Sequence, residues 1–328
     1  MRIYYNVVEA RKPLVCRWDP ARYIRPIMPD VILRHVPGMR HAAAVPTHRV
    51  EDLSESVFTG DYVANSQPCV IKGAVRHWPA VEKWRDAAHL KSRAGHHKVS
   101  LFSSEYYARW DRLEAAKTEM RFSEAVDRLC APDTKLGIVV AALGELQSDL
   151  GGLSFLTQAE PAFTYEAARF FFFRNAGTSW HFHSFDETLM SQVVGTKKIG
   201  LLKTNTPSYQ AMLTLFCEEK YYDDPSAFDG FDGSGLEWFE AELGPGDALY
   251  IPPLWWHGVI ATSEGLGATT AVTWRSPPHV IADSIRQMAA GEIDLIGMPN
   301  LEAVKALVAV ARKMGLEKEL AVAWQRRM

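Results

Sequence analysis

The stretch Trp180-His181-Phe182-His183-Ser184-Phe185-Asp186-Glu187 contains two histidines two residues apart, with a carboxylate three residues further on. It follows an apolar segment, Arg169 to Arg174, that predicts a β-strand, and a short turn is expected at residues 177–179. Side chains two residues apart on a β-strand point to the same side. His181 and His183 are therefore expected to face the same way, as two ligands of one metal ion would.

A third histidine, His257, ends the segment 244–257, which reads Gly-Pro-Gly-Asp-Ala-Leu-Tyr-Ile-Pro-Pro-Leu-Trp-Trp-His. The first four residues of this segment form a turn signature, and a strand is expected to follow them. A non-haem iron that activates oxygen needs only about three protein ligands on one face, and imidazole and carboxylate groups suit it. The two histidine segments together therefore predict one metal site, although neither is specific alone.

Composition indicates a globular protein that is large enough to bury a sizeable core. The chain has 328 residues, of which 47% are hydrophobic and 23% charged, and its net charge is −3. This balance gives no sign of a nucleic-acid-binding surface, so nucleic acid is an unlikely partner. No run of 18 apolar residues is present, so no membrane partner is expected. The four cysteines lack C-x-x-C spacing, and reduced thiols in a cytoplasmic protein are expected.

The hydrophobic pattern predicts short helices before residue 150 and many short strands after it. Helices are expected at 51–57, 81–90 and 122–129, with Ser123 as the cap of the third, and residues 136–143 are ambiguous. Strands are expected at 68–73, 99–101, 169–174, 181–194, 197–202, 236–243, 248–251, 258–261 and 268–274. Many short strands at regular spacing favour a β-sandwich or barrel.

Three regions are expected along the chain. Residues 1–49 are rich in proline and are predicted to form an irregular N-terminal extension. Residues 50–276 carry the strand pattern and the histidines. Residues 277–328 contain three amphipathic segments and are predicted to form a C-terminal helical segment, which either caps the barrel or makes a homodimer.

Several motifs resemble those of one enzyme family. The segment 243–257 resembles the second-histidine motif of JmjC-type (cupin-like) 2-oxoglutarate oxygenases, and Gln192-Val-Val-Gly-Thr-Lys197 resembles their Q-V-x-G-x-K strand. Residues 68–84 resemble the N-terminal region of the same family. The resemblance covers residues 50–276 and is nearest to the branch of factor-inhibiting HIF and the tRNA wybutosine hydroxylase. It implies a mainly β fold with some α, a double-stranded β-helix (jelly-roll) flanked by N-terminal helices.

The resemblance also implies a set of site residues. His181 and His257 match the first and last iron ligands, and Lys197 matches the lysine that holds the far carboxylate of 2-oxoglutarate. Thr178 is expected to assist Lys197. Two further positions that bear asparagine in the factor-inhibiting-HIF branch fall on residues that can still donate a hydrogen bond, Thr188 and Thr273.

The second iron ligand departs from the family pattern, which is His-x-Asp, whereas this chain has His181-Phe182-His183. Three arrangements are open. His183 ligates the metal directly, which is favoured; Asp186 reaches it instead; or the ligands are His183 and Asp186, with His181 outside the site. A third neutral ligand would leave the site one charge unit more positive than two histidines and a carboxylate.

The implied activity is that of an Fe(II)- and 2-oxoglutarate-dependent dioxygenase that uses O₂ and hydroxylates a side chain of a peptide or protein. The alternatives are a hydroxylase of a tRNA base or small molecule, a three-histidine oxygenase that needs no 2-oxoglutarate, and a non-catalytic cupin-type binding protein with a degenerate metal site.

Overall fold

The structure, a computed structural model, describes residues 41–275 except residues 104–116, 133, 142, 158, 163–167, 182, 184–185, 204–235 and 254. The expected helices at 280–290, 301–314 and 317–325 and most of the N-terminal extension lie outside the described residues. In the described part of that extension, two short strands, β1 (Ala43–Ala44) and β2 (Thr47–Arg49), add parallel partners to two different sheets. The expected domain boundaries stay predictions.

Strands predominate in the described residues between 160 and 275, as the sequence predicts for this part of the chain. The helical elements are a 3₁₀ turn (Val50–Asp52), α3 (Glu55–Val57), a π-helical turn (Phe58–Val63), α4 (Pro79–Lys83), α5 (Ala87–Ala94), α7 (Phe122–Cys130) and α8 (Gly144–Gln147). The early strands are β3 (Cys69–Lys72), β4 (Lys98–Ser103), β5 (Lys117–Arg121), β6 (Leu136–Ala141) and β7 (Glu160–Pro161). The later strands are β8 (Arg169–Arg174), β9 (Gly177–His181), β10 (Asp186–Val194), β11 (Lys197–Leu202), β12 (Trp238–Leu243), β13 (Ala248–Ile251), β14 (Trp256–Ala261) and β15 (Gly267–Arg275).

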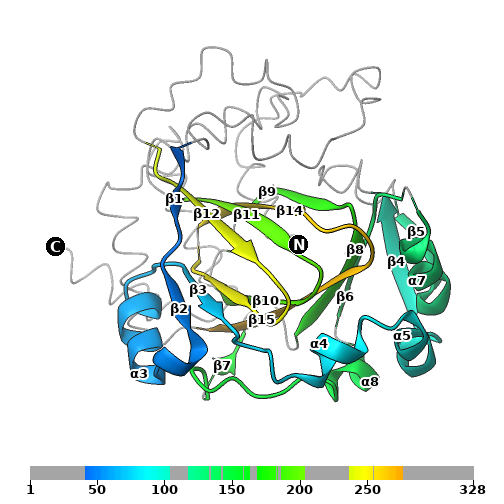
Figure 1. The fold of residues 1–328 in the computed structure, drawn as a ribbon, viewed down its shortest axis with the longest axis horizontal. Helices are drawn as coiled ribbons and strands as arrows, with labels where there is room; N and C mark the ends of the chain where they lie inside the picture. Colours follow the sequence, from blue (N-terminus) through cyan, green and yellow to red (C-terminus); the bar gives the residue numbers. More distant parts are fainter. Residues whose placement is uncertain are drawn as a thin grey trace, which may run out of the picture.

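The last eight strands form a jelly roll. Apart from the consecutive strands β11 and β12, which pair with each other, they alternate between two sheets, with the order β12-β11-β14-β9 in a five-stranded sheet and β13-β10-β15-β8 in a ten-stranded sheet. All neighbours within these two sets of four are antiparallel. Figure 1 shows one sheet lying over the other, with α4, α5, α7 and α8 outside the larger sheet. This arrangement is the double-stranded β-helix that the resemblance implies.

The two faces of the larger sheet bury different cores. The interior cluster contains Ile199, Leu201 and Val259 of the smaller sheet and Leu249 and Ile251 of the larger one. The outer cluster joins the other face of the larger sheet to the helices. Its fully buried aromatic members are Phe58, Trp84, Phe122, Phe155, Phe170, Phe172 and Tyr250. On β10, Leu189 and Val193 belong to the outer cluster, whereas Met190 packs against the interior cluster, as the alternation of side chains along a strand requires.

Two of the connections between the sheets are tight turns. Gly195, with a φ of +77°, joins β10 to β11, and a side chain there would meet Ser263 Oγ at 2.5 Å. Asp247 follows β12, and its carboxylate accepts hydrogen bonds from Gly244 N at 3.0 Å, Gly73 N at 3.1 Å and Lys72 Nζ at 2.8 Å. Each of these tight turns fixes where the next strand, β11 or β13, begins.

Two predictions about helices are wrong. The helix expected at 81–90 is two helices, because Asp86 adopts an extended conformation and caps α5 by accepting a hydrogen bond from Ala88 N at 2.8 Å. Ser123 does not cap α7, which begins one residue earlier, at Phe122. The backbone N–H of Ser123 instead donates to Gly95 O at 3.1 Å, a tertiary contact that local sequence does not reveal.

The strand expected at 181–194 is also wrong, because it is interrupted. Strand β9 ends at His181 and β10 begins at Asp186. The turn expected at 177–179 lies earlier, at Asn175, whose φ is +47°, and residues 177–179 belong to β9. Asparagine tolerates this left-handed conformation better than most residues do. The ambiguous segment at 136–143 contains a strand, β6.

Candidate active site

His257 lies on β14 inside the jelly roll and is fully buried. Its Nδ1 is 3.0 Å from the backbone oxygen of Trp255. A carbonyl oxygen can only accept a hydrogen bond, so Nδ1 carries the proton and, in the neutral ring, the lone pair is on Nε2. Histidines that bind metals are commonly oriented by such a bond from the other ring nitrogen.

His183 lies outside both flanking strands, yet its ring reaches His257. The two ring centroids are 4.9 Å apart and the ring planes are inclined by 75°. His183 Nδ1 is 2.7 Å from the hydroxyl of Thr188 on β10. The prediction that His181 and His183 lie two residues apart on one strand is therefore wrong, because the strand ends at 181. Tertiary packing, and not strand periodicity, brings His183 to His257.

A β-bulge explains how the remaining residues of the motif reach the same sheet face. His181 lies opposite His257, whereas Thr178 lies opposite Val259, so β9 contains one extra residue between these pairs. Without the bulge, positions 178 and 181 would fall on opposite faces. The side chain of His181 lies outside the described part of the structure, and its assignment as a ligand stays a prediction.

Lys197 provides a buried cation on the same interior face. It begins β11 opposite Leu243 and Ala261, and it is 7% exposed. Its ammonium nitrogen lies 4.0 Å from the centre of the Phe173 ring. Burial lowers the pKa of the Lys197 amine to about 7. No ion pair joins Lys197 to a carboxylate among the residues that the structure describes.

The spacing between Lys197 and His257 suits a small dicarboxylate. His257 lies opposite Leu201, four residues along β11 from Lys197. Four residues of strand span roughly 13 Å. A lysine side chain and a five-carbon dicarboxylate together can bridge this distance, and a charge-assisted bond to the far carboxylate would offset its loss of hydration.

The two threonines expected to contact the co-substrate lie directly opposite each other. Thr188 on β10 pairs with Thr273 on β15. The Thr188 hydroxyl is engaged by His183, so its clearest role is to orient that ring. The Thr273 hydroxyl is buried and has no hydrogen-bond partner among the described residues. A buried hydroxyl in this state is costly, which suits a position that meets a ligand.

Asp186, the alternative ligand, is the first residue of β10 and is 3% exposed. It shares a face with Thr188 and lies opposite Arg275. Asp186 and His183 are thus only three residues apart, at the start of β10 and just before it. The structure shows the His183 ring in contact with the His257 ring.

The residues present fit a metal. In His257 and in His183, Nδ1 lies within hydrogen-bond distance of an oxygen atom. This arrangement is common in histidines that bind a metal through Nε2. Two imidazoles with a further imidazole or carboxylate are ligands that suit non-haem iron. The same chain supplies Lys197 for an anionic co-substrate. The arrangement can thus hold an iron ion and a dicarboxylate beside one another in a site from which water is largely excluded.

Sequence reasoning places Phe173 among the aromatic residues near the site, but it missed the contact of Phe173 with Lys197 and the role of Gly267. Phe173 covers Lys197, and it can do so because Gly267 lies opposite it on β15. A Cβ atom at position 267 would lie 2.2 Å from the Phe173 ring. A glycine opposite an aromatic residue is the signal that could have indicated this close approach, but only once the strand register is known.

Comparison with known proteins agrees with this geometry. Residues 54–211 match the family model of the cupin-like domain, and residues 164–279 match that of the JmjC domain. The chain is 26% identical over 250 residues to lysine-specific demethylase JMJ30 of Arabidopsis thaliana, a match that covers 66% of this chain and 52% of that protein.

Two further relatives carry different names. Jumonji C domain-containing protein 5 of Drosophila melanogaster is 24% identical over 226 residues, which cover 63% of this chain and 54% of that protein. Human tRNA wybutosine-synthesizing protein 5 is 28% identical over 104 residues, or 32% of either chain. The matches to the demethylase and the Drosophila protein span about half the length of those relatives.

The jelly-roll topology, the contact between His183 and His257 and the two family matches agree with one another. Within residues 54–279, this chain therefore carries a region that matches the cupin-like and JmjC domains.

Proposed function

We propose that this protein is an Fe(II)- and 2-oxoglutarate-dependent dioxygenase that hydroxylates a side chain of a peptide or protein. The observation that carries the proposal is the shared interior of the jelly roll, where the rings of His183 and His257 meet and the buried Lys197 lies on the same face without a described carboxylate partner. Proteins with JmjC domains typically use this metal and co-substrate.

In the proposed site, His181, His183 and His257 hold the iron, with Asp186 as the alternative to His183. The iron would supply the redox chemistry that activates O₂. Lys197 binds the far carboxylate of 2-oxoglutarate, and the hydroxyl of Thr273 is available to the same ligand. The carbonyl of Trp255 fixes the tautomer of His257, and the hydroxyl of Thr188 orients the ring of His183.

The protein also excludes water from the reacting groups. His257 and Lys197 are buried, and the Phe173 ring covers the lysine ammonium. A buried cation binds an anion more strongly than an exposed cation does, because the local dielectric is low. The chain therefore holds the co-substrate by its far end and fixes the position of its other end relative to the histidines.

The proposal is tested by metal and co-substrate binding before any substrate is known. Anaerobic addition of Fe(II) and then 2-oxoglutarate should produce a weak visible charge-transfer band, and exposure to O₂ should release succinate slowly. His257→Ala should abolish both signals while the protein stays folded by circular dichroism. The absence of both signals in the wild-type protein would favour the non-catalytic binding protein.

The names of the relatives favour particular first substrates. Two classes deserve direct comparison: peptides, including methylated-lysine peptides, because of the demethylase relatives, and tRNA, because of the wybutosine relative. The net charge of −3 makes the peptide class the stronger candidate. Stimulation of succinate release by a peptide pool but not by tRNA is the expected result, and the reverse would transfer the proposal to a tRNA base.

A further inference from the structure

Two consecutive histidines meet one carboxylate on the outside of the barrel. His97 Nε2 is 2.8 Å from Glu145 Oε2, and His96 Nε2 is 3.4 Å from Glu145 Oε1. One ligand atom of each of the three side chains lies within 4.8 Å of the others. None of the three belongs to the site inside the barrel, and among the described residues this is the one such cluster of at least three metal-binding side chains.

The geometry of the histidines is unusual for neighbours in sequence. The rings of His96 and His97 lie 4.1 Å apart between centroids and are inclined by only 35°, so they stack. Consecutive side chains in an extended segment would point to opposite sides. Here the chain leaves α5 through the tight turn at Gly95, and both Nε2 atoms approach the same carboxylate.

The backbone of the histidine pair is fixed by neighbouring elements. His97 O accepts a hydrogen bond from Phe122 N at 2.8 Å, and Gly95 O accepts one from Ser123 N at 3.1 Å, both at the start of α7. A side chain on Gly95 would bring a Cβ atom to 2.2 Å from Lys91 O. The turn that presents His96 and His97 therefore requires glycine at position 95.

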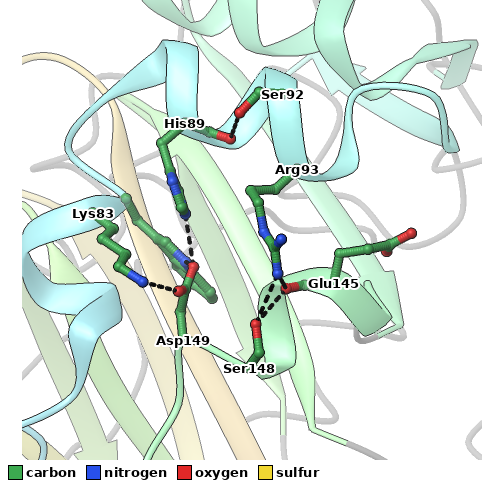
Figure 2. A network of polar contacts seen from close by, with 8 residues as sticks. Lys83, His89, Ser92, Arg93, Glu145, Ser148 and Asp149 are labelled. Atoms are coloured by element: carbon green, nitrogen blue, oxygen red, sulfur yellow. Dashed lines mark hydrogen bonds and ion pairs between the residues drawn. The ribbon is translucent and has the colours of Figure 1, made fainter.

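The backbone of Glu145 is held in place by hydrogen bonds. Glu145 lies on α8, and its backbone oxygen accepts hydrogen bonds from Arg93 Nη2 and Ser148 Oγ, each at 2.9 Å. Figure 2 shows this contact, with the Glu145 carboxylate directed away from the neighbouring Asp149. A hydrogen bond within Glu145 itself and the hydrogen bond from His97 lower the pKa of the Glu145 carboxyl, so this group is ionised at neutral pH.

We infer that His96, His97 and Glu145 form a second metal site, which takes a divalent transition-metal ion such as Zn²⁺. Two imidazole nitrogens and a carboxylate oxygen are a ligand set that zinc accepts, with metal–ligand distances of about 2.0–2.2 Å. The two histidine Nε2 atoms lie 2.8 and 3.4 Å from the oxygens of Glu145, so small side-chain rotations would make room for an ion between them. Three protein ligands leave a fourth position to water or an exogenous ligand.

The site would link separate parts of the helical layer. His96 and His97 lie between α5 and β4, whereas Glu145 lies on α8. α8 follows β6, which pairs with β4 in the larger sheet. A bound ion would therefore cross-link the helices that cover one end of this sheet, and would stabilise the folded state in proportion to its concentration and affinity.

The test is the number of zinc ions bound per chain in protein without a histidine tag, measured by equilibrium dialysis and elemental analysis. Wild-type protein should bind one equivalent more than His97→Ala, His96→Ala or Glu145→Gln at the same free zinc concentration. Because each variant removes a ligand, its affinity at this site should fall on the order of tenfold or more. The zinc-dependent rise in the thermal unfolding temperature should be larger in wild type than in each variant.

The matched control is His77→Ala, which removes another exposed imidazole, whose Nε2 is 3.0 Å from Gly152 O. It should keep the full zinc content. Glu145→Gln preserves side-chain size, and circular dichroism shows whether any variant has unfolded. A zinc content equal to wild type in any of the three folded variants would overturn the three-ligand site. The result does not depend on enzymatic activity, so it is independent of the proposed function.

Discussion

Lys197 is the residue whose charge depends most directly on the co-substrate. Burial lowers the pKa of its amine to about 7, and a bound carboxylate would raise this pKa again. The complex then holds more protons than the free protein at pH 8. We therefore expect 2-oxoglutarate to bind with proton uptake and with an affinity that falls as the pH rises above about 7. Titration calorimetry in two buffers of different ionisation enthalpy measures this uptake.

Removal of the cation should weaken co-substrate binding more than metal binding. Lys197→Met should raise the dissociation constant of 2-oxoglutarate about ten- to hundredfold, because one charge-assisted bond is lost. The control is Lys198→Met on the same strand. Lys198 pairs with Glu240 at 2.8 Å and is half-buried. Equal losses in the two variants would argue against a specific role for Lys197.

The second metal ligand can be assigned by comparing two substitutions. His183→Ala should lower the affinity for Fe(II) on the order of tenfold or more, because His183 contacts His257. Asp186→Asn should have a much smaller effect. Anaerobic competition with a chromophoric chelator measures both constants. The opposite order would assign Asp186 as the ligand and make the site an ordinary two-histidine, one-carboxylate centre.

At the scale of elements, Asp149 holds α4, α5 and the segment after α8 together. Its carboxylate is 2% exposed and accepts hydrogen bonds from Lys83 Nζ at 2.9 Å, Trp84 Nε1 at 3.1 Å and His89 Nε2 at 2.8 Å. Figure 2 shows Lys83 and His89 converging on it. Burial alone would raise the pKa of this carboxyl, but the three hydrogen bonds outweigh burial and lower it.

Removal of this carboxylate should loosen the helical layer. Asp149→Ala should lower the free energy of unfolding by about 1–3 kcal/mol, because it leaves the buried Trp84 Nε1 and the partly buried His89 Nε2 without an acceptor. Asp127→Ala is the control: Asp127 pairs with Lys91 on the exposed surface, and its loss should cost less than about 1 kcal/mol. Urea unfolding at pH 7 measures both. Because the pKa of Asp149 is lowered, its contribution should be lost as the pH falls towards that pKa.

At the scale of the whole molecule, a buried carboxyl should control how stability depends on pH. Burial raises the pKa of Glu187 to about 8, and Tyr250 donates a hydrogen bond to Glu187 Oε2 at 2.5 Å. Between about pH 4.5 and 8, the folded state holds a proton that the unfolded state has lost. Stability from this group therefore falls as the pH rises through that window.

Glu187→Gln should remove this dependence. The free energy of unfolding of the variant, relative to wild type, should rise between pH 5 and pH 8 by on the order of 1 kcal/mol. Chemical denaturation at several pH values measures the difference. Above pH 7 the unfolded state holds a proton that the folded state has lost at Lys197, so the contribution of Lys197 to stability rises with pH. Lys197→Met should therefore be measured beside Glu187→Gln. An unchanged difference across pH 5–8 would show that Glu187 is ionised in the folded state.

The association state is a further prediction for the whole chain. The amphipathic segments within residues 277–328 are predicted either to cap the barrel or to form a homodimer, and they lie outside the described residues. In light scattering of the full chain, a mass near twice 36.8 kDa would assign the homodimer. A mass near 36.8 kDa would favour helices that only cap the barrel. The protein's location in the cytoplasm is likewise an expectation, and no described helix is long and apolar enough to span a membrane.

Sequence alone determined the class of fold and several members of the site. Strand positions such as those of β8, β11 and β13 follow from apolar residues bounded by turn residues, because these signals are local. The motifs around His257 and Lys197 identified the jelly-roll family, which the topology and the family matches confirm. The cap at Asp86 was missed, although aspartate before an alanine-rich run is a common helix start.

Only the tertiary structure decided how the residues around the two histidines at 181 and 183 are used. The break after His181 and the bulge in β9 depend on pairing with β14, which is distant in sequence. The contact of His183 with His257 and the bond from Thr188 join three separate segments. The cluster at His96, His97 and Glu145 likewise depends on packing between helices. Local patterns specify the elements, whereas contacts between distant elements determine which side chains meet.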